Sequence, residues 1–193
     1  MKKLVSRDKK LRAYIVGLAL GDGNLSNPNG RAVRLRITCD KRYKKLLHHI
    51  AKSLQRLFPD NSVNIVNQRS CADVSVYSNH LPKLLEWRWD GGPKDKQNVA
   101  VPPWIKQRAI YTKECLRGLL QTDGSLYHDR GYPMINFVNT CETLAHDAFS
   151  MMRSIGYSPT MQKLEQSNKK IKHTIRLSKN VHRFVDEIKY WKA

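Results

Sequence analysis

The chain of 193 residues has few acidic side chains, only four cysteines and no long apolar segment. Its cysteines, Cys39, Cys71, Cys115 and Cys141, show no Cys-x-x-Cys spacing, which argues against structural zinc and favours a reduced protein. No apolar run approaches the roughly 20 residues that a membrane span requires. The basic, then apolar, N-terminus resembles a secretion signal, but the same pattern recurs in mid-chain, where no such signal acts. We therefore expect an intracellular protein, cytoplasmic or organellar, without a membrane partner.

The charge that is present is mostly positive. Thirty-five Lys and Arg face 16 Asp and Glu, so the formal net charge is +19, spread along the whole chain. Such a field suits a polyanionic partner such as nucleic acid. Charge alone does not separate a DNA enzyme from a basic RNA-associated protein.

One apolar motif occurs twice. Residues 15–23 read IVGLALGDG and residues 116–124 read LRGLLQTDG, which places Asp123 101 positions after Asp22 (123 − 22). Each copy predicts an apolar helix that ends in a lone carboxylate followed by glycine. A carboxylate there faces the negative end of the helix dipole, so we expect a cation nearby, with a divalent metal as the leading candidate. A single Asp-Gly usually marks only a turn, whereas two copies in matched context favour a functional site.

The segments after the two motifs follow the same order. Alternating hydrophobicity predicts strands at 33–40, 63–68 and 73–77 in the first half and at 135–142, 160–164 and 173–178 in the second. Helical spacing predicts helices at 45–58 and 81–87, matched by 144–155 and 181–190. With one further strand after each motif, both halves have the order αββαββα, and the strands at 33–40 and 135–142 both end in Thr-Cys-acid.

The repeat predicts an α+β fold of two pseudo-symmetric units. We expect an N-terminal half at 1–89, a connector rich in glycine and proline at 90–106, and a C-terminal half at 107–193. Small residues lie four apart on each motif helix, at Gly17 and Gly21 and at Gly118 and Thr122. Such faces let helix backbones approach closely, so the motif helices should pack at the interface with Asp22 and Asp123 side by side.

On these residues the chain resembles the monomeric LAGLIDADG homing endonucleases, the single-chain class with two motif copies. The resemblance covers nearly the whole length, including Pro102-Pro103-Trp104 before the second motif helix. It implies that each half carries a curved antiparallel sheet and that the two sheets form a DNA-binding saddle. It also implies that Asp22 and Asp123 bind metal, whereas Leu20 and Gln121 occupy a variable position of the motif.

The resemblance further implies a lysine near each acid, from the segment after the last helix of each half. These are Lys94 or Lys96 in the first half and Lys189 or Lys192 in the second. Family members often place a polar side chain near the end of the strand before the second helix, at about Cys39 and Cys141 here.

The acids, the carbonyls of Gly21 and Thr122, and phosphate oxygens would form an oxygen-rich site suited to Mg²⁺. Mn²⁺ or Ca²⁺ would substitute for binding. Two acids allow one metal-assisted cut in each strand, and the resemblance implies a staggered double-strand break with 3′ overhangs, which we expect at an intron-insertion site. An intron RNA-splicing maturase and a non-cleaving DNA-binding protein on the same scaffold remain alternatives.

Polar residues alternate along the predicted strands, so that Arg34, Arg36 and Thr38 share one face. Such a β-ribbon can enter the major groove and read base edges. The predicted DNA contacts are Arg31, Arg34, Arg36, Thr38, Gln68, Arg69, Asp73, Ser75, Tyr77, His128, Arg130, Asn136, Val138, Thr140, Lys163, Lys170, Lys172, Thr174 and Arg176. Because strands of about ten residues span about ten base pairs each, a monomer would cover an asymmetric double-stranded target of roughly twenty.

Overall fold

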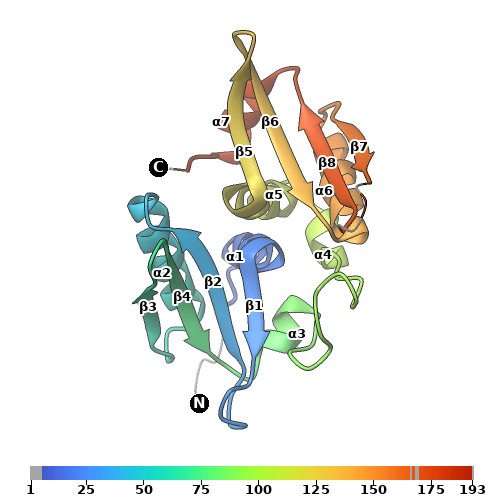
Figure 1. Cartoon of the computed structure of the whole chain (residues 1–193). Coiled ribbons are helices and arrows are strands. Elements are labelled where there is room, and N and C mark those ends of the chain that lie inside the picture. Colours follow the sequence, from blue (N-terminus) through green and yellow to red (C-terminus); the bar gives the residue numbers. More distant parts are fainter. Residues whose placement is uncertain (1–5, 166, 168–169, 193) are drawn as a thin grey trace.

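The computed structural model describes residues 6–165, 167 and 170–192. It consists of two halves with the same order of elements (Figure 1). The N-terminal half contains α1 (Lys9–Asp22), β1 (Gly23–Ser26), β2 (Arg34–Asp40), α2 (Lys44–Leu57), β3 (Val63–Asn67), β4 (Cys71–Tyr77) and α3 (Leu81–Leu85). The C-terminal half contains α5 (Ala109–Asp123), β5 (Gly124–Asp129), β6 (Tyr132–Asn139), α6 (Glu142–Ser154), β7 (Thr160–Leu164), β8 (Lys172–Leu177) and α7 (Val181–Ile188), preceded by a short α4 (Pro103–Lys106). The predicted α+β fold of two αββαββα units is confirmed.

Each half builds one antiparallel four-stranded sheet. The strand orders are β1-β2-β4-β3 and β5-β6-β8-β7, so the two sheets have the same topology. Helices α2 and α6 cover one face of the sheets, and the other face is left uncovered (Figure 1). Along β2, Leu35 and Ile37 are fully buried while Arg34 and Arg36 are only half-buried, so the alternation in the sequence corresponds to the two faces.

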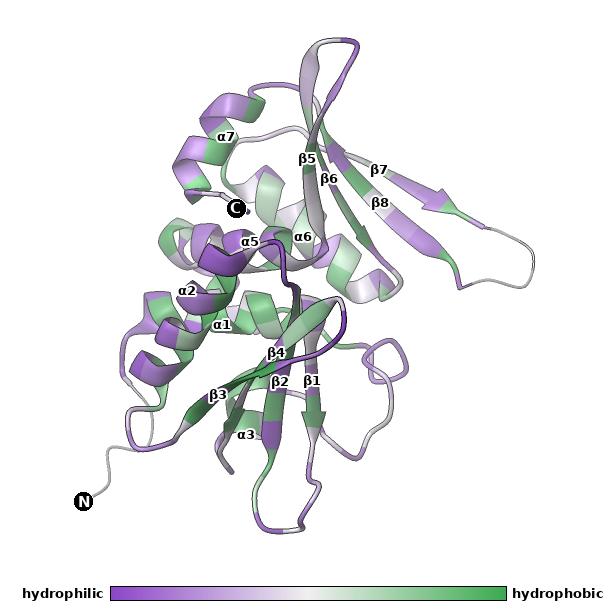
Figure 2. Ribbon diagram, turned by 60° about the vertical axis from the view of Figure 1, so that its left-hand side comes forward, coloured by the Kyte–Doolittle hydropathy of each residue, from purple (hydrophilic) through white to green (hydrophobic). Residues whose placement is uncertain are grey.

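Helices α1 and α5 pack against each other between the two sheets, where hydrophobic residues of both gather (Figure 2). A Cβ atom on Gly17 would overlap the carbonyl oxygen of Cys115, and one on Gly118 would lie 2.5 Å from the carbonyl oxygen of Tyr14. Both glycines therefore allow backbone-to-backbone contact that any larger residue would prevent. This confirms that the motif helices pack at the interface.

The two halves differ by one residue in their first hairpin. Gly23 pairs with Ile37, 14 positions later (37 − 23), whereas Gly124 pairs with Phe137, 13 positions later (137 − 124). Cys39 is therefore the structural counterpart of Asn139, and the predicted equivalence of Cys39 with Cys141 is wrong. The hairpin loop sets strand register, and its length is not visible in the motifs.

Two further differences concern element ends. The predicted strand 135–142 ends earlier, at Asn139, so that Thr140 lies in a bend and Cys141 is the N-cap of α6. In the described part of the chain, no helix is both long and apolar enough to span a membrane.

Candidate functional site

The two motif carboxylates lie at adjacent helix ends. Asp22 is the last residue of α1 and Asp123 the last residue of α5, immediately before the first strand of each half. A Cβ atom on Gly21 would lie 3.4 Å from Asp123 Oδ2, so the second carboxylate contacts the last turn of the first helix. Asp22 is exposed and Asp123 is half-buried. The structure thus brings together the two acids predicted from the repeat.

Both acids have raised pKa values. Loss of solvation and the neighbouring negative charge of Asp22 raise the pKa of Asp123 to about 6, against the lowering effects of Asn139, Lys94 and Lys192. Loss of solvation also raises the pKa of Asp22, and the same two lysines lower it. Two like charges held close together in a partly desolvated place favour a bound cation.

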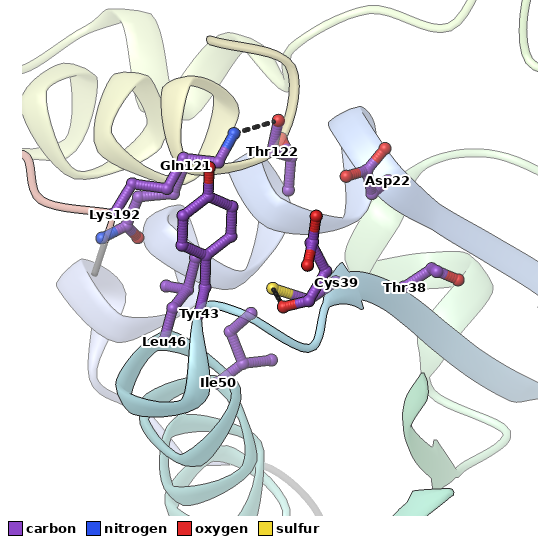
Figure 3. A pocket seen from close by; sticks show the side chains of 10 residues that line it. Asp22, Thr38, Cys39, Tyr43, Leu46, Ile50, Gln121, Thr122 and Lys192 are labelled. Atoms are coloured by element: carbon purple, nitrogen blue, oxygen red, sulfur yellow. Dashed lines mark hydrogen bonds between the residues drawn. The ribbon is translucent and has the colours of Figure 1, made fainter. Parts of the chain in front are cut away.

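A lysine caps the C-terminal end of each motif helix. Lys94, from the segment between α3 and α4, donates from Nζ to the carbonyl oxygens of Gly21 and, at 2.7 Å, Leu20. Lys192, which follows α7, donates to the carbonyl oxygen of Thr122 at 2.9 Å (Figure 3). It also donates to the carbonyl oxygen of Gly124 at 3.1 Å. A cation at this end of a helix compensates its dipole. The chain therefore supplies part of the positive charge that the sequence predicts near these carboxylates.

Of the four candidate lysines, the structure places Lys94 and Lys192 at the acids. Lys96 is exposed and does not line the cavity beside Asp22. Lys189 ends α7 in the left-handed conformation, with φ 54°, and lines a groove with Ala109 at the opposite end of α5. Lys189 therefore lies away from the acids, which contradicts its predicted catalytic role, and a catalytic role of Lys96 stays a prediction. The chain continues for three residues beyond Lys189 before it reaches the acids, so Lys192 is the lysine that lies there.

The donor set suits a hard divalent cation that also binds substrate. The carbonyls of Gly21 and Thr122, predicted as ligands, accept hydrogen bonds from the two lysines, which leaves the two carboxylates as the charged ligands. Among the described residues, no cluster of three or more His, Cys, Asp or Glu side chains could hold an ion. Mg²⁺ is commonly held by one or two carboxylates together with water and phosphate oxygens, so Asp22 and Asp123 fit this ion.

Sequence reasoning missed Asn139. Its Nδ2 donates a hydrogen bond of 2.7 Å to Asp123 Oδ2, and its Oδ1 accepts one of 2.8 Å from the backbone N–H of Cys141. The amide is thus held at both ends and orients the carboxylate. A polar side chain at the end of β6 could have indicated it. Aligning the two Thr-Cys-acid sequences paired Cys39 with Cys141 and so hid the correspondence of Cys39 with Asn139.

Within the described residues, Asp22 has no hydrogen-bonded partner of this kind. Cys39 occupies the position that corresponds to Asn139, and it lines a cavity of about 280 Å³ together with Asp22, Tyr43, Thr122 and Lys192 (Figure 3). Burial and nearby carboxylates raise the pKa of the Cys39 thiol to about 11, so it stays protonated at neutral pH. The surroundings of the two acids are therefore unequal.

The uncovered face of the first sheet carries pre-positioned arginines. Arg36 lies 3.8 Å from Asp73 Oδ2, and Arg34 Nε donates to Ser26 Oγ at 3.2 Å. Thr38 Oγ1 donates to Asp73 Oδ1 at 2.7 Å. Asp73 and Ser75 are only 7% and 8% exposed, which contradicts their predicted direct contact with DNA. The side chains of Arg36 and Thr38 on the neighbouring strand β2 contact Asp73 and occupy its polar atoms.

The other predicted DNA contacts lie on the strands, apart from six that lie outside them: Arg31, Gln68, Arg69, Arg130, Thr140 and Lys170. Arg176 Nε donates to Asn136 Oδ1 at 3.2 Å across β6 and β8, and Lys170 forms an ion pair of 2.6 Å with Asp95. Half-buried members of the set are Arg34, Arg36, Thr38, Tyr77, Asn136, Thr174 and Arg176; exposed members are Arg31, Gln68, Arg69, His128, Arg130, Val138, Thr140, Lys163, Lys170 and Lys172. Their contact with DNA stays a prediction.

The raised pKa of Asp123 predicts that this site destabilises the metal-free protein at neutral pH. A carboxyl with a pKa of about 6 when folded and 3.8 when unfolded takes up protons on folding between these values. The free energy of unfolding should therefore fall as pH rises from 4 to 7. Asp123→Asn removes this effect and should raise the unfolding free energy at pH 7 by about 1–2 kcal/mol, and the gain should vanish below pH 4.

Thermal unfolding in EDTA over this pH range measures the difference. Asp40→Asn is the control, because Arg42 lowers the pKa of Asp40 and its substitution should change stability in the opposite direction. Equal unfolding temperatures for Asp123→Asn and the unsubstituted chain at pH 7 would contradict the expected destabilisation by the charged Asp123 carboxylate.

Comparison with known proteins identifies the motif and the fold. A family model described as the LAGLIDADG-like domain matches residues 111–189. No curated protein sequence matches the chain.

Solved structures match both halves together. I-DmoI in complex with DNA and Mn is 19% identical with a TM-score of 0.69, and the match covers 93% of this chain and 96% of that chain. Mesophilic variants from the homing endonuclease I-DmoI are 17% identical with a TM-score of 0.67, over 92% and 87% of the two chains. The N-terminal LAGLIDADG domain of WhiA is 11% identical with a TM-score of 0.63, over 97% and 87%. The resemblance predicted from the two motifs is confirmed, and at these identities the structural likeness concerns the fold.

Proposed function

We propose that this chain, which has the two-motif fold of the LAGLIDADG proteins, is a site-specific double-strand DNA endonuclease. The observation that carries the proposal is the pair Asp22 and Asp123 at abutting helix ends, each beside a lysine that caps the same helix. Helices α1 and α5, which end in this pair, lie between the two sheets (Figure 1). The strands of these sheets carry basic side chains such as Arg34, Arg36 and Arg176. The proteins of similar fold include I-DmoI bound to DNA with Mn.

Asp22 and Asp123 would hold the divalent metal against the scissile phosphates. A bound Mg²⁺ supplies charge neutralisation at phosphate oxygens and lowers the pKa of water, which favours in-line hydrolysis. Asn139 keeps the Asp123 carboxylate in place through its 2.7 Å hydrogen bond. Lys94 and Lys192 lie beside the acids, where their ammonium groups would stabilise the negative charge that develops on the phosphate. We infer that each lysine serves one of the two strands.

The finer features follow from the arrangement in two unequal halves. One acid and one lysine per half support a cut in each strand, with 3′ overhangs as the expected product. Arg36 pairs with Ser75 where Asn136 pairs with Arg176, so the target should be asymmetric, and we propose a length of roughly twenty base pairs for a monomer. An intron-insertion site is the proposed location.

Cleavage of a randomised DNA library tests the proposal. The purified chain is incubated with Mg²⁺ and linear duplexes that carry a randomised 24-base-pair segment, and new ends are captured and sequenced. Recurrent cuts in related sequences, with a fixed 3′ offset and none in EDTA, are the expected result. The control is the double variant Asp22→Asn, Asp123→Asn. A chain that enriches sequences by binding yet never cuts them overturns the proposal.

That last outcome would favour the alternative of a nucleic-acid-binding protein without cleavage, for which the fold is also suitable. An in vitro splicing reaction with the host intron would then separate a maturase from a DNA-binding protein. Both acids are retained at the helix ends together with their lysines, and this supports the endonuclease.

Arg36→Ala should weaken DNA binding in a salt-dependent way. If the guanidinium contacts one phosphate, its loss should reduce affinity about tenfold near 0.1 M salt and lower the slope of log K against log salt by about 0.9. Fluorescence anisotropy at several KCl concentrations with Ca²⁺ measures both quantities. Lys52→Ala is a matched control, because Lys52 is exposed on α2, which packs on the covered side of the same sheet. An equal loss in both variants would mean that charge acts only through the overall field.

A further inference from the structure

Gln121 is a buried polar residue within the second motif helix, and the proposed cleavage chemistry leaves it without a role. It is 1% exposed, and its counterpart in the first motif, Leu20, is fully buried and apolar. A buried amide costs free energy unless its hydrogen bonds are satisfied. The difference between the motifs therefore indicates that Gln121 makes hydrogen bonds that have no equivalent at Leu20 in the other half.

The two ends of the Gln121 amide bind two distant segments. The hydroxyl of Tyr14, in α1, donates to Gln121 Oε1 at 2.7 Å. Gln121 Nε2 donates to the backbone carbonyl of Trp191 at 2.9 Å. A carbonyl can only accept, so the NH₂ group must face Trp191. Gln121 thus ties the first motif helix to the segment that follows α7.

The residue after Trp191 is Lys192, whose ammonium caps α5 beside the acids. The Trp191 ring meets the His49 ring edge-on at 5.4 Å, and His49 meets Tyr14 at 5.5 Å. Lys192 Nζ also lies 5.5 Å from the centre of the Tyr43 ring. His49 and Tyr43 belong to the N-terminal half, so Trp191 and Lys192 of the C-terminal half contact the other half across the interface.

The other lysine is held in a different way. Lys94 contacts three carbonyls at the end of α1 and lies 5.9 Å from the centre of the Trp87 ring, without contact to Gln121. Tyr14 has its own support, since the Arg117 guanidinium lies over its ring at 4.3 Å from the centroid. Arg117 and Gln121 are four residues apart on α5, which places both on the face that meets Tyr14.

We propose that Gln121 is a positioning residue that holds residues 190–192 so that Lys192 reaches the end of α5. This inference rests on the proposed cleavage activity. It makes the cut assisted by Lys192 depend on the chain Tyr14–Gln121–Trp191, whereas the cut assisted by Lys94 does not. The variable position of the motif thus makes the two strand cuts unequal.

Gln121→Glu tests the inference with almost no change of shape. The carboxylate still accepts from Tyr14 but presents an acceptor to the Trp191 carbonyl, so the segment should detach. On a duplex labelled on each strand, we expect one strand cut to slow about 10- to 100-fold and the other to change less than about twofold. Nicked DNA should accumulate, with an unchanged KM for DNA. Lys192→Met should slow the same strand, and Lys94→Met the other.

A double-variant cycle separates positioning from general stability. The pair Gln121→Glu, Lys192→Met should be no slower than Lys192→Met alone, because both remove the same ammonium from its place. Equal slowing of both strands, or additive losses in the double variant, would overturn the inference. If Gln121→Glu does not fold, Tyr14→Phe should produce a smaller slowing of the same strand; slowing of both strands by this variant also overturns it.

Failure of the proposed function gives a different result. If the unsubstituted chain does not cut DNA, the endonuclease proposal fails, and hydrogen exchange at the amides of residues 190–192 then decides the positioning role alone. Faster exchange in Gln121→Glu at unchanged global stability supports that role. Unchanged exchange overturns it.

Discussion

Asp22→Asn should leave specific DNA binding intact and reduce double-strand cleavage by a factor on the order of 10³ or more. The substitution keeps the shape of the side chain and removes the charge that a divalent metal needs. Asp22 is exposed at the end of α1 and has no hydrogen-bonded partner among the described residues, so little else is lost. Rates on a cognate duplex at saturating enzyme and Mg²⁺, beside anisotropy in Ca²⁺, measure chemistry and binding separately.

Asp40→Asn provides the matched comparison. Asp40 is an acid of the same cavity, but its carboxylate is engaged by Arg42 at 2.8 Å. Its substitution should change the cleavage rate by less than about threefold, since the charge is already neutralised by its partner. Cleavage at the full rate by Asp22→Asn would sink the two-carboxylate mechanism. A parallel loss in Asp40→Asn would instead assign the effect to the charge of the cavity as a whole.

Gly17→Ala and Gly118→Ala should each destabilise the protein by about 3 kcal/mol, although alanine favours helix by about 1 kcal/mol. At both positions the added methyl group meets backbone of the opposite helix, which has no rotamer to change. The helices must therefore separate. Because native proteins are stable by only about 5–15 kcal/mol, the double variant should be largely unfolded at 37 °C, as measured by circular dichroism during urea and thermal unfolding.

Gly21→Ala is the informative control on the same helix face. There the methyl group would meet the side chain of Thr122, whose Cβ is 2.7 Å from the added atom, and not backbone. Thr122→Ala should relieve this contact, so the pair Gly21→Ala, Thr122→Ala should recover most of the stability. If Gly17→Ala were as stable as the unsubstituted chain, the close approach of the helices would not be a requirement of the fold.

The fold could be predicted from the sequence because the same pattern of elements is repeated in the two halves of the chain. Element order, the close helix pair and the two acids follow from residues that are near one another in sequence or repeated at a constant distance. A weak periodic signal becomes specific when it recurs in the same order, as it does after Asp22 and after Asp123.

The surroundings of the acids could not be predicted to the same extent, because they depend on contacts between distant segments. Asn139 escaped because a hairpin one residue shorter moved the register of β6. The sequence could not favour Lys192 over Lys189, because the direction of the chain after α7 depends on the left-handed conformation of Lys189. Burial of Asp73 likewise depends on its contacts with Arg36 and Thr38 of the neighbouring strand, which local alternation does not reveal.

The contact between the glycines of α1 and α5 sets a limit on recombining this protein with relatives. A foreign C-terminal half could be joined only if its motif helix brought no side chain opposite the carbonyl of Tyr14 and the backbone of Gly17. It would also have to supply an ending that fits against His49 and Tyr43 of the retained half. Swapping halves to change DNA specificity should therefore require that the foreign half fit both the contact between α1 and α5 and the contact with His49 and Tyr43.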